Sequence, residues 1–219
     1  MTRICFLLAA LAGGVIAPAR VQAQVPGRCE TKATQHPAEV GCYLLDSMPI
    51  GHPPAKALFW HIYSFPSLVD AKSSRATTGV AVEAYGRSWL FTIAPRDWRP
   101  AAGKQVAVLG PLAATSDRIY TAHYAQATLV PGLKTLVHRH PGPEVFFVLD
   151  GSQCVESMYG KKVTKAGESA MLPGGTWMQL RHYGSDTLRS ILLILHESEQ
   201  PLTDRTPTEE WKPQDLCAS

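Results

Sequence analysis

The 219-residue sequence predicts an all-β protein, and two observations carry that prediction. No long stretch repeats its apolar residues at the helical period of 3.6. Instead, short segments rich in Val, Ile, Leu, Phe, Trp and Tyr alternate with Gly, Pro, Asp and Ser, which is the pattern of many short strands joined by turns. A sequence of this kind is typical of a β-sandwich or β-barrel.

The first 23 residues have the features of a signal peptide rather than of the fold. Arg3 supplies a positive charge, residues 4–16 are apolar, and Val21-Gln22-Ala23 offers small residues for cleavage. Pro18 and Arg20 interrupt the apolar run, which disfavours the alternative of an uncleaved membrane anchor. We therefore expect a periplasmic or secreted protein with no stable membrane span after cleavage.

Export would give the cysteines an oxidising environment. Cys5 leaves with the signal peptide, and four cysteines remain. Cys29 and Cys42 are close in the sequence and are expected to pair, which leaves Cys154 with Cys217. Free buried thiols are the alternative.

The strands are expected in two blocks. The first block comprises residues 57–65, 79–85, 88–94 and 104–110, and the second comprises residues 118–130, 134–140, 144–150, 152–159, 169–173, 176–183 and 188–197. Residues 67–78 are polar and predict a short helix or a loop.

A weak internal similarity bears on the domain organisation. Residues 85–111 align loosely with residues 150–173, which fits either a duplicated unit or the chance likeness of two hairpins. We accordingly predict that residues 24–115 form a degenerate copy of the following unit or an N-terminal extension of it. Residues 116–198 would form the main barrel, and residues 199–219 a tail.

A short helix is expected in that tail. Thr206 can cap it, Pro207 suits its first position, and Glu209 stands three residues after the cap, as in a capping box. The helix would end near Pro213.

The composition excludes some classes of function. The net charge is only +3 and no basic run occurs, so nucleic-acid binding is not indicated. The sequence contains no G-x-S-x-G elbow, no phosphate-binding Walker loop and no H-E-x-x-H motif.

The stretch from Gly132 to Gly151 carries three good metal ligands. His138 and His140 are two apart, so in a strand their side chains share one face. Pro141-Gly142-Pro143 makes a turn, and Glu144 starts the next strand beside them. Two imidazoles and a carboxylate suit a divalent Fe, Mn, Zn, Ni or Cu ion, and the residues do not choose among these. The alternative is a surface hairpin with two solvated histidines.

These residues also resemble the first motif of the cupin superfamily. Gly132-x5-His138-x-His140-x3-Glu144-x6-Gly151 agrees with that motif at every position. The second motif, Gly-x5-Pro-x-Gly-x2-His-x3-Asn, is similar to Gly167-x5-Pro173-x-Gly175-x2-Met178-x3-His182. Its histidine is replaced by Met178 and its asparagine by His182.

The resemblance implies a jelly-roll barrel, or a degenerate bicupin if the first block is a copy, with a metal in the mouth of the barrel. The ligands would be His138, His140 and Glu144. Met178 could leave a coordination position open, ligate copper itself, or mark a site that has lost affinity. We favour the first, because Met usually fills apolar space. His182 is expected at the rim.

We therefore expect an exported, metal-binding cupin that takes a small-molecule ligand or substrate. Oxygenase or isomerase chemistry follows from the breadth of the family rather than from any residue here. A non-catalytic binding module for a small molecule or a metal is the alternative, because a fold alone does not determine function. A homodimer is compatible with the resemblance. His61 and His123, in other apolar segments, are expected to be core histidines.

Overall fold

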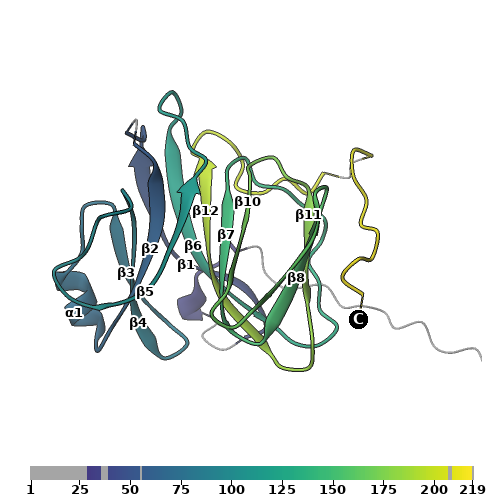
Figure 1. Cartoon of the computed structure of the whole chain (residues 1–219), viewed down its shortest axis with the longest axis horizontal. Helices are drawn as coiled ribbons and strands as arrows, with labels where there is room; N and C mark the ends of the chain where they lie inside the picture. Colours follow the sequence, from purple (N-terminus) through teal and green to yellow (C-terminus); the bar gives the residue numbers. More distant parts are fainter. Residues whose placement is uncertain (1–28, 36–38, 55, 207–208, 219) are drawn as a thin grey trace, which may run out of the picture.

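The structure of the protein, a computed structural model, describes residues 29–35, 39–54, 56–206 and 209–218. The predicted signal peptide lies outside these residues. The described strands form three antiparallel sheets arranged as successive layers (Figure 1). Among the described residues, none of the helices is long and apolar enough to cross a membrane.

The central layer is a five-stranded sheet. Its strands, in spatial order, are β1 (Gly41–Gly51), β6 (Tyr120–Leu129), β12 (Leu188–Glu197), β7 (Glu144–Asp150) and β10 (Ser169–Leu172). Alternate residues of β12 face opposite sides, so that Ile191 and Leu193 pack in one apolar cluster and Leu192 and Ile194 in another. Burial on both faces explains why this strand reads as a continuous apolar run.

On one side of the central sheet lies the three-stranded sheet of β11 (Met178–His182), β8 (Ser152–Ser157) and β9 (Gly160–Lys165). Together the two sheets enclose an apolar cluster that includes Phe146, Leu180 and Leu192. The described sheets do not close into a barrel, and two facing sheets of this kind are compatible with a jelly-roll. The fold is therefore mostly β, as predicted.

On the other side lies the four-stranded sheet of β3 (Gly79–Ala84), β4 (Arg87–Ala94), β2 (Leu58–Phe65) and β5 (Lys104–Leu112), with α1 (Leu68–Ser73) packed against it. The helix occupies part of the segment expected to be a short helix or a loop. Its Ser67 cap accepts a hydrogen bond from the Asp70 amide. Trp60 and Phe91 of this sheet share a core with Tyr124 of β6.

The described part of residues 24–115 therefore contributes to two layers. Strand β1 pairs with β6 in the central sheet, whereas β2 to β5 form a sheet of their own. Because β1 completes the sheet that carries β6, β12 and β7, we propose that residues 24–115 extend the unit at 116–198 rather than duplicate it.

Three details of the sequence prediction were wrong. Residues 134–140 were expected to form a strand, but they make only isolated bridges, and β1, β9 and the three-residue 3₁₀ turn η1 (Ala33–Gln35) were not foreseen. No helix occurs in the described tail, residues 199–206 and 209–218, although Pro207 and Thr208 at the expected start lie outside the described residues.

The tail is extended because tertiary contacts hold it to the three-stranded sheet. The carboxylate of Glu156 accepts hydrogen bonds from the amides of Gln214 and Leu216, and Arg181 pairs with Asp215. Within the expected helix, the Glu210 carboxylate accepts a hydrogen bond from the Trp177 indole at 2.8 Å, and tertiary contacts of this kind outweigh the local preference for a capped helix. The disulfide between Cys154 and Cys217 fixes the end of the tail, and Cys29 is bonded to Cys42, so both predicted pairings are present.

Candidate metal centre

The three candidate ligands come from one continuous stretch. Glu144 is the first residue of β7, and the histidines lie in the extended segment before it. Between them, Gly142 touches the backbone of Leu195 so closely that a Cβ would overlap the Leu195 carbonyl oxygen. The absence of a side chain thus lets the turn press onto β12 and places Glu144 opposite Ile194.

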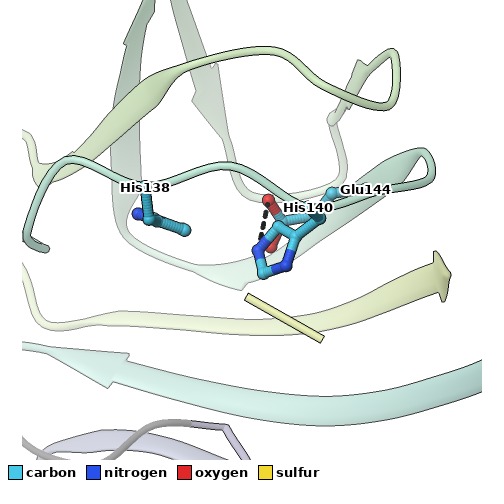
Figure 2. Close-up of side chains that lie close together, drawn as sticks. All are labelled: His138, His140 and Glu144. Atoms are coloured by element: carbon cyan, nitrogen blue, oxygen red, sulfur yellow. Dashed lines mark ion pairs between the residues drawn. The ribbon is translucent and has the colours of Figure 1, made fainter. Parts of the chain in front are cut away.

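The geometry brings the ligands together, as Figure 2 shows. One side-chain atom from each of His138, His140 and Glu144 lies within 4.8 Å of the other two, and all three residues are buried. The two imidazole rings are 5.1 Å apart, centre to centre. The histidines are therefore not solvated on a surface hairpin, which was the alternative left open by the sequence.

Backbone carbonyls fix the orientation of both imidazoles. The Nδ1 atom of His138 is 2.8 Å from the Leu136 carbonyl oxygen, and that of His140 is 2.6 Å from the Leu202 carbonyl oxygen. Because a carbonyl oxygen can only accept, each Nδ1 carries the proton and donates. The lone pair of each ring is then on Nε2, as in most metal-binding histidines.

The protonation states follow from burial. Burial lowers the pKa of His138 to about 4. Burial, followed by the neighbouring charge of His138, lowers the pKa of His140 to about 3. Both rings are therefore neutral near pH 7. Burial also raises the pKa of Glu144, since the charged carboxylate loses its hydration.

When Glu144 is ionised, the arrangement brings hydrogen-bond acceptors together without a donor. Nε2 of His140 lies 3.6 Å from Oε2 of Glu144, the contact dashed in Figure 2. This distance is too long for a hydrogen bond, and the contact joins a neutral ring to a carboxylate. Oε2 of Glu144 is buried and has no hydrogen-bond partner within the described part of the chain. Such an atom is costly unless a cation neutralises it, so these residues fit a divalent metal.

The position of the missing family histidine faces the same space. Met178 and His138 exchange both backbone hydrogen bonds, at 3.0 and 2.9 Å, so they are directly opposite in an antiparallel bridge. Opposite residues of such a bridge project to the same face. Met178 is buried and packs in the apolar cluster between the two sheets, which agrees with the expectation that it fills apolar space.

The other histidines lie outside the ligand group. His182 was expected at the rim, but it is buried and its Nε2 donates to the Asp186 carbonyl oxygen at 2.7 Å. His61 is a core residue, as expected, whose Nε2 donates to Pro95. His123 was assigned to the core as well, but it is only partly buried and lies 4.7 Å, ring to ring, from His196.

The ligands open onto a cavity of about 80 Å³. Its walls are mostly apolar, with residues from the central and three-stranded sheets and from the Cys29–Cys42 disulfide. The polar residues that join the ligands in the lining are Thr135, Thr203 and Arg205. Sequence reasoning missed Thr203 and Arg205, because they follow β12 by a loop and only the fold brings them to the site.

Comparison with known proteins gives the family of this unit. The profile of a family described as a cupin domain matches residues 125–194. Residues 125–194 therefore carry a cupin domain. A search of curated protein sequences found no significant match.

Several solved structures, two of them described as cupin or cupin-like proteins, are similar to parts of the chain. A cupin-like protein from Thermotoga maritima has 18% sequence identity and a TM-score of 0.36, over 41% of this chain and 68% of its own. A cupin family protein from Methanocaldococcus jannaschii has 14% identity and a TM-score of 0.34, over 36% and 72%. A DMSP lyase from Ruegeria pomeroyi has 19% identity and a TM-score of 0.35, over 42% and 45%.

Proposed function

We propose that the cupin domain holds one divalent metal ion through His138, His140 and Glu144, and that a small molecule binds beside it. The observation that supports this most strongly is the cluster of three buried acceptor groups, with both imidazoles oriented by backbone carbonyls. Three protein ligands leave further coordination positions open, and the cavity provides the space next to them.

A bound ion would supply polarisation of an oxygen-bearing ligand or activation of water or dioxygen, which are the steps on which metal enzymes rely. The protein's own part is to orient His138 and His140, to keep water away by means of apolar walls, and to hold the ligand. Oxygenase or isomerase activity is the enzymatic form of this proposal.

A non-catalytic binding module is the second candidate, and one observation favours it. Among the described residues that line the cavity, only the three proposed ligands are carboxylates or histidines. The remaining polar groups, Thr135, Thr203 and Arg205, do not exchange protons readily near neutral pH. A reaction that needs a separate general base would therefore find none in this lining.

The metal site is tested by analysing metal in the mature protein. Purified protein should contain a divalent metal in stoichiometric amount, and the double variant His138→Ala, His140→Ala should contain little. His182→Ala is the matched control, because His182 is equally buried but lies outside the ligand group. Equal metal content in the double variant and the wild type would reject the site.

We also propose that the protein is exported. The two disulfides fit a periplasmic or extracellular location, where thiols oxidise. N-terminal sequencing of the protein from the periplasm or medium should find a mature chain that begins at Gln24. A chain that retains Met1 would contradict cleavage of the signal peptide. Sedimentation of the mature protein would test whether it forms the homodimer.

A further inference from the structure

The loop that follows β12 is fixed to the candidate metal centre by residues just before Arg205. Its Leu202 carbonyl accepts the Nδ1 proton of His140. Asp204 exchanges two backbone hydrogen bonds with Arg139, at 3.0 and 2.9 Å, and its carboxylate also accepts from the Arg139 guanidinium at 3.0 Å. Because these preceding residues are held in place, the contacts that orient the proposed metal ligand His140 also determine the position of Arg205.

Arg205 lies where two hollows meet. The inner one is the cavity of about 80 Å³ at the metal ligands, and the outer one is a wider hollow of about 590 Å³. Both are lined by His140, Thr203 and Arg205.

The charges of the inner lining favour an anionic ligand. Glu144 is the one carboxylate among the described residues of that lining, so a divalent ion and Arg205 together exceed its charge. The carboxylates at the outer hollow are engaged elsewhere: Asp204 with Arg139 at 3.0 Å, and Glu197 with Arg118 at 2.7 Å. Within a mostly apolar cavity, excess positive charge is poorly screened and attracts an anion.

Size and polarity narrow the class of ligand. A cavity of about 80 Å³ has room for roughly five to eight water molecules, hence for a small organic molecule rather than a polymer. Leu180 and Leu192 offer its body an apolar wall. A guanidinium binds a carboxylate through two parallel hydrogen bonds, which makes Arg the suitable residue at the entrance.

We propose that the cavity binds a small carboxylate with an apolar body, and that its charged end lies between the metal ion and Arg205. This inference rests on the proposed metal function and specifies its ligand. Arg205 is a positioning and specificity residue for that ligand.

The experiment compares butyrate with butyramide, which has the same shape and no charge, in calorimetric titrations of the zinc-loaded mature protein. Inorganic sulfate serves as a third probe for general anion binding. The variants are Arg205→Gln, Arg205→Lys and, as control, Arg189→Gln, a surface arginine near Asp150 at the opposite end of β12. Metal content and thermal unfolding of each variant are measured first.

We expect butyrate to bind the wild type at least tenfold more tightly than butyramide. Arg205→Gln should reduce that preference about tenfold or more without changing the metal content, Arg205→Lys should retain part of it, and Arg189→Gln all of it. Equal binding of butyrate and butyramide to the metal-loaded wild type would overturn the proposal. So would an unchanged preference in Arg205→Gln, or sulfate binding as tight as butyrate.

Failure of the metal function gives a different result. If the wild type holds no metal, the same titrations on the metal-free protein test whether the cavity binds a carboxylate, separately from the metal function. An Arg205-dependent preference for butyrate would still support it, and no preference would reject it.

Discussion

Replacing Glu144 by Gln should have opposite effects on stability with and without metal. The substitution keeps the shape of the side chain and removes its charge. Without metal, burial raises the pKa of Glu144, and its Oε2 lacks a hydrogen-bond partner among the described residues, so the charged form of this side chain is costly. An unsatisfied buried polar group costs roughly 1–3 kcal/mol, and more if it is charged. Glu144→Gln should therefore stabilise the metal-free protein by an amount in that range.

With metal, the same change removes the anionic ligand. At a metal concentration about 100 times the dissociation constant, binding stabilises the wild type by about 2.7 kcal/mol. If the variant binds about 100-fold more weakly, its metal-linked stabilisation falls to about 0.4 kcal/mol. The response to metal should thus shrink by about 2.3 kcal/mol, enough to reverse or nearly cancel the advantage that the variant has without metal.

The control is Glu156→Gln. Glu156 is as buried as Glu144, at 2% against 4% exposed, but its carboxylate accepts hydrogen bonds from two backbone amides of the tail. A Gln side chain has one acceptor oxygen, so one amide would face an NH₂ group. This variant should lose stability under both conditions and respond to metal like the wild type.

Urea denaturation with a chelator and with added zinc measures all of these differences. The reasoning would be refuted by a Glu144→Gln variant that gains as much stability from zinc as the wild type does. It would also be refuted if Glu144→Gln destabilised the metal-free protein as much as Glu156→Gln does.

Three further predictions concern other parts of the molecule. Met178→His should raise metal affinity, because an imidazole opposite His138 would replace water as a metal ligand. Competitive titration with Zn, Mn and Cu measures this affinity, and an unchanged value for every ion would mean that Met178 does not face the metal. Removing the Cys154–Cys217 disulfide, which spans 63 residues, should lower the free energy of unfolding by about 4 kcal/mol, and removing Cys29–Cys42, which spans 13, should lower it by about 3 kcal/mol. Denaturation of the two double Cys→Ser variants measures both losses, and the reverse order would contradict the prediction. Burial, and then the charge of His196, lower the pKa of His123 to about 4, so the unfolded chain takes up a proton at higher pH than the folded protein does. Stability should therefore fall as the pH drops from about 6.5 toward 4. His123→Gln should make that fall less steep in chelator-treated protein, and an equal slope would contradict this reasoning.

Patterns within single segments predicted much of the fold and the site. Most strands were predicted because apolar, β-branched residues and turn residues alternate locally. The proximity of His138, His140 and Glu144 was predicted because they lie within seven consecutive residues, so that one turn brings them near one another. The Pro141-Gly142-Pro143 turn brings these residues near one another, whereas contacts with Leu195 and Leu202 hold the turn and orient the His140 ring.

Two of the misses depend on contacts between distant segments. Strand β9 (Gly160–Lys165) is rich in lysine and does not read as a strand, yet it pairs with β8 along its whole length. The tail has the signals of a capped helix, but the amides of Gln214 and Leu216 bond to Glu156, nearly 60 residues earlier. Pairing partners of this kind have no signature in local sequence, so tertiary contacts override propensity.

The division between local and distant contributions also bears on function. The cupin match ends at residue 194 and begins at 125, so it contains the proposed metal ligands but not the whole cavity. Four lining residues, Cys29, Cys42, Thr203 and Arg205, lie outside it. The loop that carries Arg205 also orients His140 through the Leu202 carbonyl. A substitution in this loop should therefore change both the affinity for metal and the affinity for the small molecule. Because these four lining residues lie outside the cupin match, whereas the proposed metal ligands lie within it, we expect them to determine which small molecule binds.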